Sequence, residues 1–578
     1  MKSSDLLQHD LDRVIHAAVA HVTGGISPLS TLTAYMDWFT HLAFSPGKQQ
    51  ELALKALDKS VQLTSYAMRA ATGRECKDCI EPLPQDKRFA APQWHQWPYN
   101  VIYQGFLLNQ QWWHDATKRV RGVHQEHERM VNFAARQVLD FFSPSNFVAT
   151  NPEVLSETWK SAGQNLFNGL QNWLQDALRL ASNQPPVGVE QFKPGQEVAV
   201  TPGKVVFRNH LIELIQYSPV TEKVHAEPIL IVPAWIMKYY ILDLSPENSL
   251  VRFLVESGHT VFMVSWRNPT ADDREIGMDD YLKDGVLASF DAISAIIPGR
   301  RVQALGYCLG GTLLAIACSY MARNNDRRLH TLTLLASQLD FDEPGELALF
   351  IDESQLAFLD DIMSAQGYLD GKQMLGAFAL LNQRDLVFSR MIHDYLMGKR
   401  RAVSDLNAWN ADATRMPYHQ HSHYLHSLYL NNDFAQGRYQ VEGRPVVVKD
   451  VRVPIFCLGT ERDTISPWQS VYKIHLLTNA DITFCLTSGG HNVGVVNPPG
   501  ESSISRRYRL ATREANAPYI DPQTWNEQAE IFEGSWWPAW EEWLRKTSGG
   551  LVDPPPMGNP SIPGAACDDA PGNYVLIP

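Results

Sequence analysis

The sequence predicts an α/β protein in which a mainly helical region precedes a domain built on a largely parallel β-sheet. From about residue 191, short β-rich runs alternate with helical stretches, as in a sheet wound with crossover helices. Several of these runs are apolar throughout, as expected for parallel strands covered on both faces. One run leads through a glycine-rich turn directly into a helix. The expected strands begin at Pro228, His259, Arg301, His330, Val453 and Ala480, and helical stretches begin at Ser249 and Tyr281.

Residues 1–190 are expected to form a helical N-terminal domain. Over 155–178 apolar side chains recur on one face at helical spacing, and Asn151-Pro152 is a cap and first-turn signal. The middle of the domain is rich in aromatic residues, which we interpret as core and docking surface. The alternative is an apolar face that meets a water-insoluble partner or another subunit. These residues are Phe89, Trp94, Trp97, Tyr99, Phe106, Trp112 and Trp113.

Two further segments interrupt or follow the α/β domain, which we expect to span 191–550. Between about 341 and 445 helix-like and aromatic segments intervene, and an insertion of this size between strands usually covers the carboxyl ends of the sheet as a cap. Residues 551–578 form a Pro/Gly-rich C-terminal tail without packing periodicity.

Composition and charge exclude several classes of protein. The 578 residues include 44% hydrophobic and 20% charged residues, which is ordinary for a globular protein, and the net charge of −13 argues against a nucleic-acid binder. No stretch has the length of a membrane-spanning helix, and acidic residues near the start interrupt any signal-peptide pattern. The sequence therefore predicts a cytoplasmic protein.

The seven cysteines are an odd number scattered over a long chain, which indicates a reducing compartment. Cys76 and Cys79 form a single CxxC without a second pair or a nearby histidine, so we interpret them as incidental loop thiols and expect no metal site.

One cysteine lies in a turn with catalytic form. The turn from Gly306 to Gly310 reads G-x-C-x-G, which is the nucleophile elbow G-x-S-x-G of α/β-hydrolases with Cys308 in the serine position. The helix N-terminus behind the side chain favours the thiolate. The alternative is a buried cysteine on a glycine-rich turn. A catalytic interpretation therefore needs partner residues.

Such partners follow in the order that the fold requires, nucleophile, acid and then histidine. Asp463 lies just beyond one expected strand, and His491 lies just beyond the next. We expect His491 to remove the Cys308 thiol proton and Asp463 to orient His491. Glu461 competes for the acid role but lies nearer the strand, and we rank it second.

The oxyanion donors are expected to be backbone N–H groups. One is that of Leu309, which follows the nucleophile, and the other belongs to the loop after the strand at Pro228, where Ile236 is our choice. A thiol nucleophile favours chemistry on thioesters, because exchange of one thioester for another retains the acyl group's reactivity toward a hydroxyl. The sequence therefore favours a thioester-using acyltransferase over a lipase.

The chain resembles polyhydroxyalkanoate (PHA) synthases, also called poly(3-hydroxyalkanoate) polymerases, from about residue 80 to the end. Its length and full N-terminal domain resemble the class I type. The motifs that carry the resemblance are GYCLGG from Gly306, GTERDTISPW from Gly459, SGGHNVGVVNPP from Ser488, VPAWIMKYYILDL from Val232, VSWRNP from Val264, WNADATRMP from Trp409, GSWWPAW from Gly534, DKRFAAPQW from Asp86 and SPSNFVATNPE from Ser143.

The resemblance implies an activity. A 3-hydroxyacyl-CoA would be attacked by Cys308 with release of CoA, and a hydroxyl would then take the acyl group to extend a polyester. It also implies a homodimer on the surface of the polymer granule, and no cofactor, because coenzyme A is part of the substrate. Whether Asp463 only orients His491 or also helps to activate the hydroxyl stays open. Small departures from the family are Thr464, Asn492 and the longer tail.

Two alternatives remain at this stage. One is a cysteine hydrolase, such as a depolymerase of the same polyester, and the other is a granule-surface interaction protein with a decayed site. The acyl-chain length and the coenzyme A site are not predicted. Lys238, Arg267 and Arg415 could meet phosphates but could equally be ordinary surface or helix-end charges.

Overall fold

The chain divides into two compact units that do not coincide with continuous stretches of sequence. The helical unit consists of Thr23–Val187 and Gly376–Ala402, and the sheet unit consists of the residues before Thr23, Gly188–Leu375 and Val403–Pro578. The computed structural model describes residues 15–16, 19, 23, 25–73, 77–83, 86–374, 376, 387–500 and 505–578.

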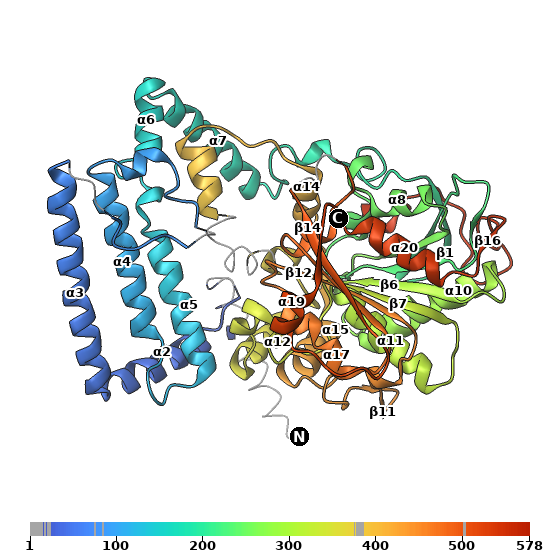
Figure 1. Cartoon of the computed structure of the whole chain (residues 1–578). Helices are drawn as coiled ribbons and strands as arrows, with labels where there is room; N and C mark the ends of the chain where they lie inside the picture. The colour runs from blue at the N-terminus through green and yellow to red at the C-terminus, as the bar shows by residue number, and fades with distance from the viewer. Residues whose placement is uncertain are drawn as a thin grey trace. The chain divides into compact units, whose positions relative to one another are not determined.

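In the helical unit four helices pack side by side, α3 on α4, α4 on α5 and α5 on α2 (Figure 1). Local signals begin two of its helices: the Ser27 side chain accepts a hydrogen bond from the Ser30 N–H before α2, and Asn151 accepts from Glu153 and Val154 before α6. The helices are α2 (Pro28–Ala43), α3 (Pro46–Ala71), α4 (Tyr99–Thr117), α5 (Gln125–Phe141), α6 (Pro152–Lys160) and α7 (Gln164–Ala181).

The aromatic middle of the helical unit forms a core. Phe89, Trp94 and Tyr103 are buried together, and the Phe89 ring meets the Trp94 ring edge-on with 4.9 Å between centroids. Trp97, in contrast, is largely exposed.

The apolar face predicted over 155–178 is not one helix. Ala162 and Gly163 adopt left-handed backbone conformations and separate α6 from α7. Trp159 is 89% exposed, so this part of the predicted face does not enter a core.

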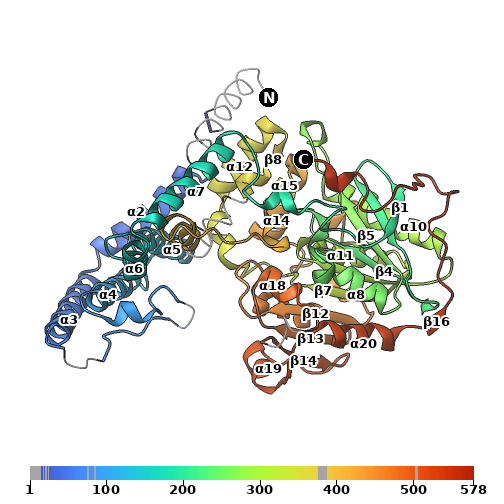
Figure 2. The ribbon, with the colours of Figure 1, turned by 90° about the horizontal axis from the view of Figure 1, so that it is seen from above.

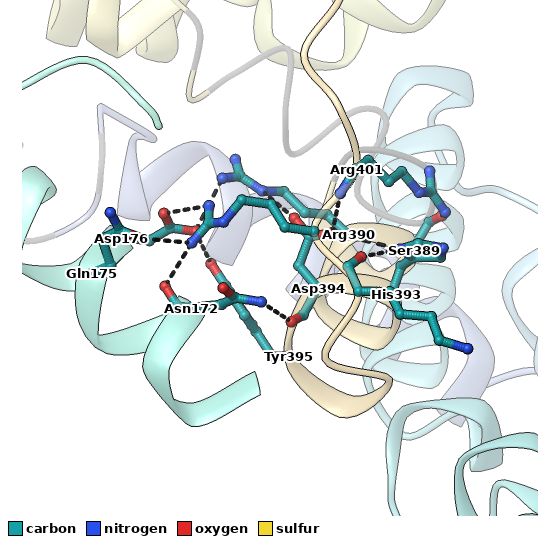
Figure 3. A network of polar contacts seen from close by, with 11 residues as sticks. Asn172, Gln175, Asp176, Ser389, Arg390, His393, Asp394, Tyr395 and Arg401 are labelled. Atoms are coloured by element: carbon teal, nitrogen blue, oxygen red, sulfur yellow. Dashed lines mark hydrogen bonds and ion pairs between the residues drawn. The ribbon is translucent and has the colours of Figure 1, made fainter. Parts of the chain in front are cut away.

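A segment of the predicted cap belongs to the helical unit. It includes the π-helix η10 (Met391–Leu396), which lies against α7. Asp176 of α7 accepts hydrogen bonds from Tyr395 at 2.9 Å and Arg400 at 2.8 Å, and pairs with Arg390 at 3.1 Å (Figure 3). A Cβ atom on Gly169 would lie 1.7 Å from the Tyr395 carbonyl oxygen, so only glycine permits this approach.

The sheet unit is organised around a ten-stranded sheet with the order β1-β2-β5-β4-β6-β7-β12-β13-β14-β15. The six central strands are parallel and two antiparallel strands flank them on each side. The strands are β1 (Gly203–Arg208), β2 (Ile212–Tyr217), β4 (Ile229–Val232), β5 (Val261–Trp266), β6 (Val302–Tyr307), β7 (Leu329–Leu335), β12 (Ile455–Thr460), β13 (Ile482–Thr487), β14 (Arg507–Arg513) and β15 (Glu530–Glu533).

The six parallel strands are the six that the sequence predicts. All but one of their residues are buried, because helices cover both faces. One face carries the core that includes α10 (Ala288–Ile296) and α11 (Leu309–Arg323), and the other carries the core that includes α8 (Leu250–Glu256) and α20 (Trp537–Thr547). Figure 2 shows α20 next to β12 and β13.

Between β7 and β12 the chain forms short helices and two small two-stranded sheets, β8 with β9 and β10 with β11, in the part of the predicted cap segment that lies in the sheet unit. Their elements are α12 (Glu353–Gln366), β8 (Tyr368–Leu369), α14 (Asp405–Ala411), β9 (Met416–Pro417), α15 (Tyr418–Tyr424), η11 (Leu425–Leu430), β10 (Gln440–Val441) and β11 (Arg444–Pro445).

The C-terminal tail packs on the sheet unit although it has no periodicity. β16 (Leu551–Val552) pairs with β3 (Val224–His225), and isolated bridges join Lys204 to Asp569 and Phe207 to Ala565 along β1. Val575 is buried in the core on the α8 and α20 side.

Candidate active site

Cys308 lies between β6 and α11 in a strained backbone conformation, with φ of 52° and ψ of −127°. Its N–H donates to the Leu335 carbonyl at 2.9 Å, and its carbonyl accepts from Gly311 at 3.0 Å. The turn is so closely packed that only glycine fits at two positions. A Cβ on Gly306 would lie 2.2 Å from Gly311 Cα, and a Cβ on Gly310 would lie 2.3 Å from the Val232 oxygen. This is the geometry of a nucleophile elbow.

The acid lies just past β12, with no exposed area on its side chain. Asp463 Oδ1 accepts hydrogen bonds from the backbone N–H groups of Ile465 at 2.9 Å and Ser466 at 2.8 Å. Asp463 Oδ2 accepts from Thr460 Oγ1 at 3.1 Å and lies 2.7 Å from His491 Nδ1. The carboxylate is therefore fixed by four donors, one of which is the predicted histidine.

Glu461, the second choice for the acid, points elsewhere. Its carboxylate lies 3.5 Å from the Arg507 guanidinium, and its side chain is 27% exposed. The structure thus brings Asp463 rather than Glu461 to His491.

His491 begins α18 (His491–Val495), and its imidazole is nearly buried. The Nδ1–Asp463 bond leaves Nε2 for the nucleophile. Burial alone would lower the pKa of His491, but the charges of Asp463 and Cys308 and hydrogen bonds to both side chains raise that pKa well above its usual value. The charged imidazolium form of His491 is therefore stabilised at this position.

Two tryptophans hold the segment that carries His491, and sequence reasoning missed their role. Trp536 Nε1 donates to the Gly494 carbonyl and Trp537 Nε1 donates to the Val495 carbonyl, both at 3.0 Å. Both indoles are buried. The signal was present in the motif GSWWPAW, because buried tryptophans need an acceptor for their N–H.

Tyr307 is a third residue that sequence reasoning missed. Its ring lies 5.6 Å from that of His491, and its hydroxyl donates to Asn492 Oδ1 at 2.7 Å. Asn492, which departs from the family pattern, thus takes part in positioning the histidine loop.

The two expected oxyanion donors belong to neighbouring segments. Leu309 begins α11, and the close approach of Gly310 to Val232 and Pro233 places this helix start against the loop that contains Ile236. That loop is itself fixed, because Met237 N–H donates to Thr414 Oγ1 at 2.8 Å.

Aromatic residues from the segment between β7 and β12 lie near the thiol. Cys308 packs against the core that contains Tyr424 and Tyr429. The Tyr424 ring lies 5.8 Å from that of Trp235 and 5.3 Å from that of Tyr429. The surroundings of Cys308 are therefore aromatic and largely apolar.

The other described cysteines differ from Cys308. Cys318, Cys457 and Cys485 are fully buried, and burial raises the pKa of each thiol. Cys567 is exposed. Of the CxxC pair, Cys79 is partly buried and Cys76 lies outside the described residues.

The three candidate phosphate cations have protein partners. Lys238 is buried and donates to the carbonyls of Val575, at 3.0 Å, and Ile577. Arg415 donates to the carbonyl of Pro578 and Arg267 pairs with Asp273 at 2.9 Å. Lys238 and Arg415 thus hold the C-terminus.

The fold and the elbow together define an α/β-hydrolase-fold enzyme with cysteine in place of the usual serine. A family model described as "alpha/beta hydrolase fold" matches residues 227–498. Models described as "Poly-beta-hydroxybutyrate polymerase (PhaC) N-terminus" and "Poly-beta-hydroxybutyrate polymerase N terminal" match residues 85–254 and 7–48.

The chain belongs to the poly(3-hydroxyalkanoate) polymerase family and is an acyltransferase. The poly(3-hydroxyalkanoate) polymerase of Methylorubrum extorquens is 38% identical over 96% of this chain and 91% of its own length. The polymerase subunit PhaC of Cupriavidus necator is 36% identical over 85% of this chain and 83% of its own length.

A monoacylglycerol lipase structure from Paleococcus ferrophilus matches 58% of this chain and 99% of its own at 10% identity, with a TM-score of 0.34, too low to add to this assignment. Within the described residues, the helices are all too short or too polar to cross a membrane.

Proposed function

We propose that this enzyme polymerises 3-hydroxyacyl-CoA thioesters into a polyester and releases coenzyme A. The observation that carries the mechanism is the 2.7 Å contact between His491 Nδ1 and Asp463 Oδ2 behind a cysteine on a strained elbow. Membership of the polymerase family supports the substrate class.

In the first half-reaction His491 takes the thiol proton of Cys308, and the sulfur attacks the thioester carbonyl. The Leu309 and Ile236 N–H groups stabilise the oxyanion that forms. When the intermediate collapses, the C–S bond to coenzyme A breaks and His491 protonates the departing thiolate. The acyl group remains on Cys308 as a new thioester.

In the second half-reaction His491 takes the proton of a hydroxyl group, and that oxygen attacks the Cys308 acyl thioester. The ester bond forms, the C–S bond to Cys308 breaks, and the proton returns to the sulfur. Asp463 holds the imidazole in the tautomer that both transfers need. This sequence needs no cofactor, because coenzyme A enters with the substrate.

We also propose that the enzyme works in the cytoplasm as a class I type homodimer on the granule surface. Exposed apolar side chains on α2 support attachment to a polyester, since contiguous apolar surface marks interaction sites. They are Leu29, Leu32, Tyr35, Met36 and Phe39.

Coenzyme A release from 3-hydroxybutyryl-CoA, followed with a thiol reagent and by turbidity, tests the activity. Wild type should release coenzyme A and form insoluble polyester, Cys308→Ala should do neither, and Cys567→Ser should match wild type because its thiol is exposed. Soluble hydroxy acid instead of polymer would identify a hydrolase. Full activity of Cys308→Ala would refute the mechanism, and an inactive but folded wild type would indicate an interaction protein.

A further inference from the structure

Three side chains with metal-ligating atoms meet in the sheet unit away from the triad. His225 ends β3, His259 lies two residues before β5, and Glu541 belongs to α20. One ligand atom from each lies within 4.8 Å of those from the other two. Among the residues that the structure describes, this is the one group of three such side chains within that distance.

This cluster lies at the edge of the sheet opposite the catalytic residues. It adjoins the amino ends of β4 and β5, whereas Cys308, Asp463 and His491 follow the carboxyl ends of β6, β12 and β13. A six-residue parallel strand is about 20 Å long. Metal bound at the cluster would therefore not take part in acyl transfer.

Backbone hydrogen bonds fix the segments that meet there. The His225 N–H donates to the Gly258 carbonyl at 2.8 Å, just before His259, and Leu551 of β16 pairs with His225. Ala226 N–H donates to the Gly550 carbonyl at 2.9 Å, shortly after the end of α20. The backbone segments on either side of the cluster are thus linked to one another by hydrogen bonds.

The two imidazoles of the cluster lie close together in the protein interior. His225 and His259 are buried, with 4.5 Å between ring centroids. Glu541, from α20, is partly buried beside them.

One polar atom of the cluster also lacks a partner. His259 Nε2 lies 3.4 Å from Glu541 Oε1, a long hydrogen bond, and the buried Nδ1 of the same ring has no hydrogen-bond partner. A buried imidazole with one weak bond and one unsatisfied nitrogen is costly for a purely structural residue. A metal ion would give the ring a strong bond.

We propose that His225, His259 and Glu541 bind a divalent transition metal, with Zn²⁺ as the best match to two imidazoles and a carboxylate. Tetrahedral donors around zinc are about 3.4 Å apart, and His259 Nε2 lies 3.4 Å from Glu541 Oε1. Water would take the fourth position, and binding would be reversible. The metal would fasten α20, which carries the start of the tail, to the amino ends of β4 and β5.

The test is titration of Zn²⁺ into chelator-stripped full-length protein carrying Cys308→Ala, which removes the thiol that would itself bind zinc. This background also makes the result independent of the proposed activity. We expect one equivalent to bind and to raise Tm, and Mg²⁺, which prefers oxygen ligands, to do neither. Co²⁺ should give visible ligand-field bands without a thiolate charge-transfer band.

Variants locate the site. Glu541→Gln, nearly isosteric, and His259→Ala should each weaken Zn²⁺ binding at least about tenfold and abolish the rise in Tm. Glu542→Gln, at the next and exposed position of α20, should bind like the parent. Absence of the bound equivalent, or binding that Glu541→Gln and His259→Ala leave unchanged, would overturn the proposal. If His259→Ala does not fold, Zn²⁺ binding by Glu541→Gln alone tests the proposal.

Discussion

At the scale of single residues, Cys308 differs from the other described cysteines in its backbone conformation and in the side chains around it. Its φ is positive, and its partners are His491, whose pKa is raised, and Asp463. The buried thiols of Cys318 and Cys457 lack such partners and are shifted toward the neutral form.

Asp463→Asn should lower kcat by roughly 10³–10⁴-fold, because an amide holds the imidazole in the wrong tautomer. Coenzyme A release measures the loss. Glu461→Gln is the matched control, since Glu461 faces Arg507. Equal losses in both variants would contradict the assignment of the acid.

His491 should make the free energy of unfolding depend on pH. Its pKa is raised in the folded protein, so its contribution is complete below the unfolded value of about 6.5 and is lost as pH rises through the folded value. In the Cys308→Ala background, which leaves only the Asp463 charge, adding His491→Gln should destabilise the protein more at about pH 6 than at about pH 9. Urea unfolding measures the difference, and a larger loss at the higher pH would reverse the assigned sign.

At the scale of elements, the triad depends on contacts between segments far apart in the chain. The loop of His491 is fixed by the start of α20, and the loop of Ile236 is fixed by Thr414 from the cap. The strand ends place the three candidate catalytic residues along one edge of the sheet, and these hydrogen bonds then set the orientation of their segments.

Trp537→Phe tests the first of these contacts. It keeps most of the buried ring but leaves the Val495 carbonyl without its donor, which costs about 1–3 kcal/mol. We expect kcat to fall about tenfold while KM changes little. Trp543→Phe, also on α20 but only partly buried, is the control. Unchanged kcat in Trp537→Phe would show that α18 needs no support from the indole.

Gly169→Ala tests the contact between α7 and the 387–401 segment. In a helix this change normally stabilises by about 0.5–1 kcal/mol, but here the new Cβ would collide with the Tyr395 carbonyl. We expect lower stability and faster tryptic cleavage after Arg390 and Arg400. Gly47→Ala in α3, where a Cβ meets open space, should not destabilise. Slower cleavage in Gly169→Ala would contradict the packing.

Elements with one dominant physical signal could be predicted, and others could not. The six parallel strands are rich in apolar and β-branched residues, and the elbow, acid and histidine follow strands in the required order. β14 and β15 were missed because they are antiparallel strands near the edge of the sheet with charged, exposed residues. The role of Trp536 and Trp537 and the anchoring of the 387–401 segment by Asp176 depend on long-range pairing that no local pattern carries.

At the scale of the whole molecule, the C-terminus is part of the sheet unit's framework. Glu213 accepts hydrogen bonds from the N–H groups of Asn573 and Tyr574, both at 2.9 Å, and Lys238 and Arg415 hold the last carbonyls. Lys238 also accepts from Trp409 through its own carbonyl at 2.7 Å. The chain end thus braces the loop that follows β4.

Lys238→Met should destabilise the protein by about 1–3 kcal/mol or more, because the carbonyls of Val575 and Ile577 lose their donor. We expect a lower urea midpoint and a lower kcat, since the adjoining loop carries the expected oxyanion donor. Lys449→Met, at an exposed position, is the control. If Lys238→Met raised KM with kcat and stability unchanged, Lys238 would contact substrate rather than the tail.

The chain enters the helical unit twice, once over Thr23–Val187 and again over Gly376–Ala402, so this unit cannot be exchanged as one continuous stretch of sequence. A chimera that exchanges residues 1–187 for those of a relative would combine the relative's α7 with the 387–401 segment of this chain. A working hybrid would therefore need Asp176, Arg390 and Arg400 from the same parent. The two coding segments would have to be exchanged together, although they are separated in the gene.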